Sequence, residues 1–210
     1  GIDINSRDCT VLSHGHFDHG NGLEYISGKT LICHPNAFIK RYRRRSQTNI
    51  GLSQDKNTLN QKFDLITSKI PYNISENIIF LGEIPRLNSF EAKKTYFRKE
   101  DGTDDFVIDD SAIILKQNNS LIIITGCGHA GICNTIDYAI KVTGIKKIKA
   151  VMGGFHLKDN DGVTKSVIKY FKEREVEYIL PSHCTELPAL AAFNEEFSIK
   201  QVKTGMLFSF

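Results

Sequence analysis

The stretch that decides the fold is Ser13-His14-Gly15-His16-Phe17-Asp18-His19-Gly20, with three imidazoles and one carboxylate between residues 14 and 19. Apolar residues at about 8–12 predict a buried strand before it, and its glycines permit a sharp turn. Alternate residues of extended backbone face one way, so His14 and His16 can hold one ion. The turn then brings Asp18 and His19 towards a second position. Imidazole with carboxylate suits Zn, Fe or Mn; the alternative is a polar surface loop, but the H-x-H-x-D-H spacing is highly specific.

Further histidines also follow expected strands, where α/β folds place their chemistry. His129 lies in the glycine-rich turn T-G-C-G-H-A-G at 125–131, and His183 lies in L-P-S-H-C at 180–184. We expect both to bind metal, although a hydrogen-bonded turn histidine is the alternative for His129. His156, in G-G-F-H, could be a metal ligand, a group that faces the substrate, or a structural residue, and the sequence does not decide between these roles. His34 precedes Pro35 and is expected to be structural or to line a pocket.

The composition is that of a globular protein. The chain has 210 residues, 40% of them hydrophobic, and a net charge of +3, which fits one globular domain and demands neither nucleic acid nor a membrane. No apolar run approaches the ~18–20 residues of a membrane span. Five cysteines without a C-x-x-C pair indicate a reducing, cytoplasmic setting. Gly1 stands where an initiator Met would be, so we expect an upstream part to be missing.

Strands and helices alternate along the chain, which favours an α/β fold. Residues 46–75 are polar and weakly periodic, so we interpret them as a flap or insertion, and residues 85–105 as an irregular loop. The expected strands are 8–12, 30–33, 78–81, 111–115, 121–125, 148–152 and 176–180, with strand character at 202 and 207–210. The expected helices are 23–27, 37–45, 135–143, 163–171 and 186–197, with Gly144 ending the third and Pro188 in the first turn of the last.

The histidine motif resembles the signature of the metallo-β-lactamase superfamily. The resemblance implies a four-layer αβ/βα sandwich, one ion on His14 and His16, a second on Asp18 and His19, and His183 as the last ligand. Further blocks narrow it to the branch of the archaeal dihydropterin-ribofuranosyl-aminobenzene-phosphate synthase and its bacterial relatives. These blocks are F-x-G-E-I-P-R at 80–86, Phe90-Glu91, Asp109-Asp110-Ser111, T-G-C-G-H-A-G-I, G-G-F-H-L and H-C-T at 183–185.

Two departures from the superfamily pattern matter. Only thirteen residues precede His14, so we expect the sandwich to lack its N-terminal strands in this chain. Many members have T-G-D, whose Asp bridges two metals, whereas the matching place here is Thr125-Gly126-Cys127. Cys127, Asp109 or a solvent hydroxide could replace the bridge, or the site could hold one ion instead of two.

The expected function is a hydrolase-like reaction on a small phosphorylated or pterin-type substrate, through a metal-activated hydroxide that Asp18 orients. A transferase joining a dihydropterin methyl diphosphate to a ribofuranosyl-aminobenzene phosphate is the alternative, and a metal-binding protein without turnover is a second. His156, Arg86 and Cys127 are candidate substrate contacts.

Residues 36–105, within a single domain 1–210, are expected to select the substrate. Their basic run, Lys40 to Arg45, is either a solvated helix face or a phosphate site. We hypothesise that Arg86 and at least one of Arg41, Arg43, Arg44 and Arg45 face the metals, with the turn at Gly128 as a further anion candidate. Nucleic acid is not expected as a partner, because no aromatic platform accompanies the run. The oligomeric state is open, a homo-oligomer included.

Overall fold

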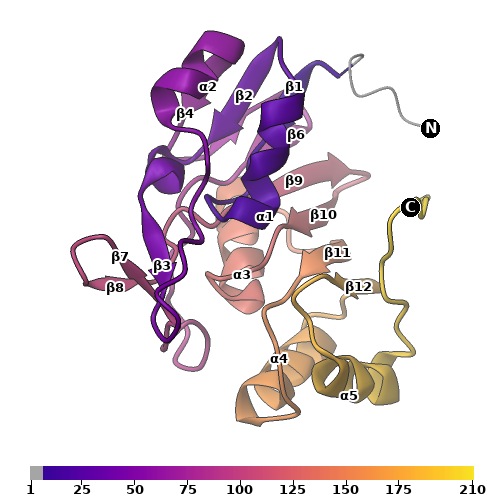
Figure 1. The fold of residues 1–210 in the computed structure, drawn as a ribbon. Helices are drawn as coiled ribbons and strands as arrows, with labels where there is room; N and C mark the ends of the chain where they lie inside the picture. The colour runs from indigo at the N-terminus through magenta and orange to yellow at the C-terminus, as the bar shows by residue number, and fades with distance from the viewer. Residues whose placement is uncertain (1–6) are drawn as a thin grey trace.

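The computed structural model describes residues 7–210, and a six-stranded mixed sheet lies at its centre (Figure 1). The order is β12-β11-β10-β9-β6-β5, and β10, β11 and β12 run parallel. The β9–β10 hairpin was predicted, and its turn is Asn118-Asn119, both with positive φ, as a tight hairpin turn requires. The bounds are β5 Tyr72–Asn73, β6 Ile78–Phe80, β9 Ala112–Gln117, β10 Ser120–Thr125, β11 Ile148–Gly154 and β12 Tyr178–Ser182.

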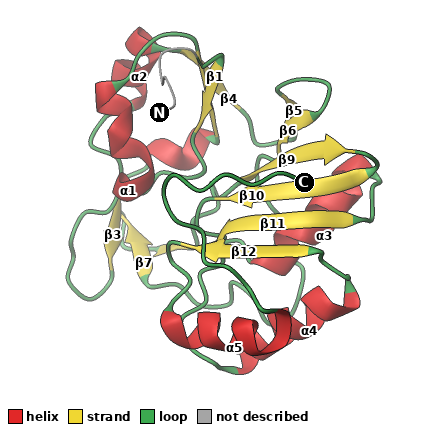
Figure 2. Cartoon of the chain, turned by 90° about the vertical axis from the view of Figure 1, so that its right-hand side faces the viewer, coloured by secondary structure: helices red, strands yellow, loops and turns green. Residues whose placement is uncertain are grey.

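Three helices cover one face of this sheet: α3 Ile132–Thr143, α4 Gly162–Glu173 and α5 Leu187–Phe197 (Figure 2). Their apolar faces join the strands in the larger core, which includes Ile123, Ile136, Phe171 and Phe193. Local chemistry sets the ends: Gly144 caps α3 with a φ of 73°, and the Asp161 carboxylate accepts the Thr164 N–H at the start of α4. Within residues 7–210, no helix combines the length and apolar character needed to cross a membrane.

A second unit carries the histidine motif. Its parallel sheet, in the order β1-β2-β4, consists of β1 Cys9–Val11, β2 Thr30–Cys33 and β4 Asp64–Thr67. The helical segments α1 Phe17–Gly20, η2 Asn21–Tyr25, η3 Pro35–Phe38 and α2 Lys56–Lys62 complete it. A smaller core, including Leu12, Leu31 and Leu59, fills the space between them. The α/β class expected from the sequence is confirmed.

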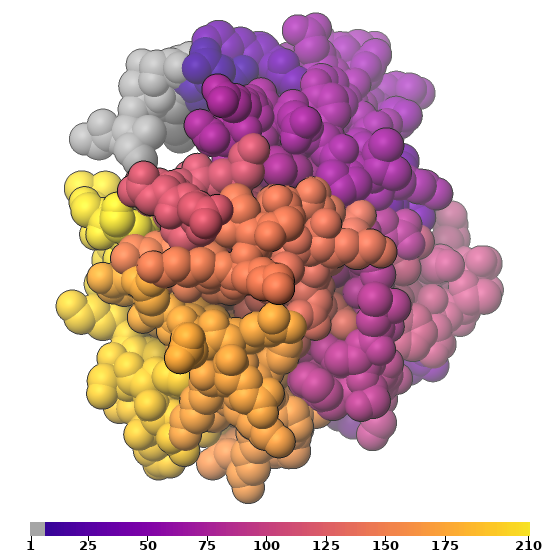
Figure 3. Space-filling model, turned by 180° about the vertical axis from the view of Figure 1, so that it is seen from behind, coloured from indigo at the N-terminus to yellow at the C-terminus, as the bar shows by residue number. Residues whose placement is uncertain are grey.

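A third, small sheet joins two distant segments of the chain. It has the order β3-β7-β8, with β3 Arg41–Arg43, β7 Phe97–Lys99 and β8 Asp104–Asp105. In the space-filling view, the purple surface of the chain before β7 lies against the orange surface of the middle of the chain (Figure 3). There Leu87 N–H and Asn88 N–H both donate to Oδ1 of Asn134 in α3. The chain between β6 and β9 is therefore anchored at both ends.

Several expected elements differ from the structure. The helix expected at 37–45 is wrong: the chain there forms η3 and then β3, because β3 pairs with β7 and Arg41 enters a buried ion pair. The polar stretch 46–75 contains α2 and β4 of the second unit, and no strand forms at 202 or 207–210. β12 continues through Pro181, because an edge strand tolerates a residue without an N–H.

Candidate metal centre

The site lies where four loops meet. They follow β1, β10, β11 and β12, and carry His14 to His19, His129, His156 and His183 respectively. Because β10, β11 and β12 are parallel, their carboxyl ends lie at one edge of the sheet. The β1 loop approaches this edge from the second unit, and Ser111 N–H donates to Ser13 O between them.

The first donor group consists of His14, His16 and His129, whose ligand nitrogens all lie within 4.8 Å of one another. His14 Nε2 is 3.1 Å from His16 Nδ1. The His129 ring centroid is 4.8 Å from that of His14 and 4.9 Å from that of His16. His129 Nε2 is buried without a hydrogen-bond partner, which is the state of a ligand nitrogen facing a cation position.

The second donor group consists of Asp18, His19 and His183, again within 4.8 Å. His19 Nε2 is 3.1 Å from His183 Nε2, and Asp18 Oδ2 is 3.3 Å from the same His183 atom. This group is more open, since the His183 side chain is 45% exposed. The structure therefore brings together all six residues that the sequence suggested as ligands, in two groups of three.

Both groups fit a transition-metal ion. Metal–nitrogen bonds of ~2.1 Å at a tetrahedral angle put neighbouring ligand atoms about 3.4 Å apart. The nitrogen–nitrogen contacts of 3.1 Å in both groups are close to that separation. Burial lowers the pKa of His16 to about 3 and holds those of His14 and His129 well below the usual value, so these rings are neutral and free to coordinate.

Three buried charged groups hold the first donor group in place. The Asp109 carboxylate accepts Gly15 N–H at 2.7 Å and the Arg41 guanidinium at 2.8 Å. Asp110 accepts Ala130 N–H at 2.8 Å, and burial raises its pKa to about 7. Both oxygens of Asp109 are thus engaged by these two donors. Sequence reasoning noted this Asp pair but missed the role of Arg41, because nothing local indicates its distant partner.

Cys127 lies beside the second donor group, with Sγ 3.1 Å from His19 Nε2. The neighbouring Cys184 thiol donates to the Cys127 carbonyl oxygen at 3.3 Å. The structure thus places Cys127 next to the histidines and not in the cavity described next.

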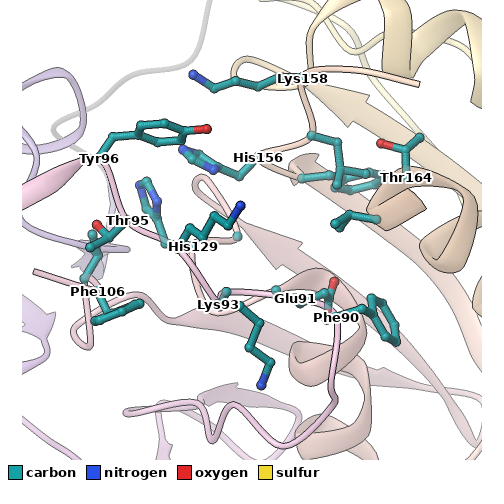
Figure 4. Close-up of a pocket in the computed structure, with 18 of the residues that line it drawn as sticks. Phe90, Glu91, Lys93, Thr95, Tyr96, Phe106, His129, His156, Lys158 and Thr164 are labelled. Carbon is teal, nitrogen blue, oxygen red and sulfur yellow. The ribbon is translucent and has the colours of Figure 1, made fainter. Parts of the chain in front are cut away.

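A cavity of about 340 Å³ opens next to the first donor group. His129 and His156 form one wall, and their ring centroids are 4.3 Å apart. In Figure 4, Tyr96 and His156 lie together near His129, and Lys158 extends over Tyr96. Burial lowers the pKa of His156 to about 4. The remaining wall is largely aromatic, with Phe90, Phe97, Phe106 and Phe155, and it carries both lysines and carboxylates, among them Lys94, Glu91, Asp159 and Asp161.

Three of the arginines suggested as anion ligands are held by other groups. Arg86 does not line the cavity: its guanidinium donates to Phe106 O at 2.8 Å and Val107 O at 2.9 Å. Arg41 is fully buried in its ion pairs, and Arg44 pairs with Asp104 at the surface. The structure thus ties Arg86 to the loop before β9, and the cations beside the cavity are Lys93, Lys94 and Lys158.

The sequence and the structure were both compared with those of known proteins. No protein-family profile matches the chain. It is 33% identical, over its whole length and 77% of the relative, to the 7,8-dihydropterin-6-methyl-4-(β-D-ribofuranosyl)aminobenzene-5'-phosphate synthase of Methanocaldococcus jannaschii. It is 37% identical to an uncharacterised protein of the same organism, over 90% of the chain and 73% of that protein. The crystal structure of a metal-dependent hydrolase of the β-lactamase superfamily superposes with a TM-score of 0.82 and 31% identity, over 96% of this chain and 77% of that one.

The chain belongs to the metallo-β-lactamase superfamily, and it is an enzyme of that class. Within the class, the similarity to the dihydropterin-related synthase extends over the whole chain, as the sequence blocks predicted.

Proposed function

We propose that this enzyme is a metal-dependent hydrolase that acts on a small, phosphorylated or pterin-type substrate in the cavity beside His129 and His156. The observation that carries the proposal is the position of two three-residue donor groups next to a cavity lined by aromatic rings and by charged side chains that include three lysines. Two divalent ions, Zn, Fe or Mn, would occupy the groups. A catalytic zinc site keeps three protein ligands and an open position, and each group has that form.

The ions would supply Lewis acidity and lower the pKa of water. The chain's own residues would orient the reacting groups. Asp18 is the carboxylate of its group and is exposed, so it can accept a proton from the attacking water. Neutral His156 can donate one hydrogen bond and accept another from a substrate in the cavity.

Substrate selection would fall to the segment between β3 and β9, within a single domain 1–210. Of the expected selector, residues 36–105, the part that reaches the cavity is 90–97. Phe97 packs on the metal-site histidines, 4.9 Å from the His16 ring and 5.6 Å from the His129 ring. Tyr96 and Phe90 offer faces for a planar ring, and Lys94 and Lys158 offer charge to a phosphate.

A transferase is the second candidate. The observation that favours it is the 33% identity, across the whole chain, to a relative named as a synthase. In that reaction the metal ions held by the two donor groups would bind a diphosphate leaving group. The cavity would hold the pterin while an arylamine attacks the pterin's methylene carbon.

The test combines two substrate types with one matched pair of variants. Metal-loaded protein should hydrolyse phosphodiester or pterin phosphate substrates, lose activity with chelator and regain it with Zn, Fe or Mn. Asp18→Asn should lower kcat about 100-fold or more, whereas Asp8→Asn, at a fully exposed carboxylate, should not. Product that forms only when an arylamine is added would favour the transferase. Tight metal and ligand binding with neither reaction would indicate a binding protein and refute both candidates.

A further inference from the structure

The Cys127 thiol stands at the boundary between the two donor groups. With His14 of the first group and His19 of the second, its Sγ completes a third cluster whose ligand atoms all lie within 4.8 Å of one another. The side chain is 4% exposed, so it is enclosed by these histidines and not by bulk solvent.

The distances suit a sulfur ligand. A metal–sulfur bond of ~2.3 Å and a metal–nitrogen bond of ~2.1 Å at a tetrahedral angle separate the two ligand atoms by about 3.6 Å. Cys127 Sγ is 3.1 Å from His19 Nε2, the same nitrogen that faces His183 Nε2. A cation beside this nitrogen is therefore within reach of Cys127 together with His14 and His19.

The surrounding backbone fixes the sulfur there. Gly126 and Gly128 flank Cys127 in the turn, and a side chain on Gly126 would come within 2.2 Å of Ser13 Oγ. Gly154, at the end of β11, is packed so closely that a Cβ would lie 3.0 Å from Cys127 Cα and 2.6 Å from Cys184 Sγ. Cys184 also donates to the Cys127 carbonyl oxygen. The turn therefore has little freedom to move the thiol away from His19.

We propose that Cys127 is a thiolate ligand at the boundary of the two metal positions, facing His14 of the first group and His19 of the second. Binding breaks the S–H bond, releases the proton to solvent and forms a sulfur–metal bond with the freed electron pair. Thiolate is a soft donor, so the second position would prefer zinc or ferrous iron to manganese or magnesium. The inference rests on the proposed metal-dependent function but not on any particular substrate.

Cobalt(II) loading tests the proposal on the intact chain. Cobalt-loaded protein should show the near-ultraviolet charge-transfer absorption of a thiolate–cobalt bond. Cys127→Ser should abolish this band and weaken zinc binding at one of two positions by about 10- to 100-fold, at least the effect of losing a supporting group. Cys9→Ser, a half-buried thiol in β1, is the matched control and should keep both band and affinity.

Cys184→Ser separates the two adjacent thiols. The band should survive this change, because the proposal gives Cys184 only a contact with the Cys127 carbonyl. Absence of the band in the cobalt-loaded wild type would overturn the proposal, even if the variants fail to fold. A band that persists in Cys127→Ser, or that disappears only in Cys184→Ser, would do the same. Two bound ions without a thiolate band would refute the Cys127 assignment alone, whereas failure to bind metal at all would refute the proposed function.

Discussion

Replacing Arg41 with methionine should destabilise the fold strongly, although the sequence shows Arg41 only as one of several arginines in a basic run. The side chain is 0% exposed and pairs with Asp109 at 2.8 Å and with Asp105 at 3.4 Å. Methionine keeps the apolar part but leaves two buried carboxylates without their cation. Breaking a buried pair from one side costs about 3–5 kcal/mol. For a domain of this size, 1 kcal/mol shifts Tm by about 2–4 °C, so the predicted loss is about 6–20 °C.

Differential scanning calorimetry on metal-free protein measures this loss. Lys40→Met is the matched control, because Lys40 pairs with Glu100 at 2.8 Å but is 64% exposed, and solvent-exposed ion pairs contribute little to stability. Arg41→Met should also weaken metal binding, since Asp109 holds Gly15 N–H between two ligand histidines. If the two variants melt at the same temperature, the assignment of Arg41 as the buried partner of these carboxylates is incorrect.

Three further outcomes follow from the site. Glu91→Ala should lower the free energy of unfolding by about 2–4 kcal/mol and raise KM, because Glu91 accepts two backbone N–H groups at the start of α3 and fixes the cavity wall. Chemical denaturation measures the first effect and steady-state kinetics the second. An unchanged KM would show that this wall does not contact the substrate. Metal-free protein should lose stability as pH falls from about 6.5 towards 4. Burial lowers the pKa values of His16 and His156 to about 3 and about 4, so below pH 6.5 protons bind these side chains in the unfolded chain but not in the folded one. Each group should therefore lower the free energy of unfolding by about 1.4 kcal/mol per pH unit. A urea midpoint that stays constant across this range would contradict the burial of these rings. Lys94→Ala and Lys158→Ala should each raise KM for a phosphorylated substrate about 5- to 30-fold and leave the bound metal unchanged. If the unaltered enzyme has equal KM values for phosphorylated and dephosphorylated substrates, the lysines do not form a phosphate site.

The sequence predicted well which side chains come together, because each candidate ligand lies in a short loop after a strand, so local pattern and topology suffice to bring them to one place. His129 and His183 are far from His14 in the chain, but the parallel order of β10, β11 and β12 puts their loops at one edge. The β9–β10 hairpin and α3 were likewise predicted, since turn residues and a C-terminal glycine mark their ends.

The surroundings of the donors could not be predicted in the same way, because they depend on contacts between distant residues. The helix expected at 37–45 is a strand because its partner β7 lies more than 50 residues later and Arg41 must reach Asp109. Arg86 resembled an anion ligand, but two backbone carbonyls hold its guanidinium. The cavity lysines gave no sequence signal, since a lysine in a charged loop is ordinarily solvated.

The central claim is that two metal ions bind in two three-residue groups, and metal stoichiometry tests it most directly. Protein purified without chelator and analysed by inductively coupled plasma mass spectrometry should contain two equivalents of transition metal. His129→Ala and His183→Ala, one from each group, should each retain about one equivalent and remain folded by circular dichroism. Wild-type protein without stoichiometric metal, or variants that both keep the full complement, would contradict the account.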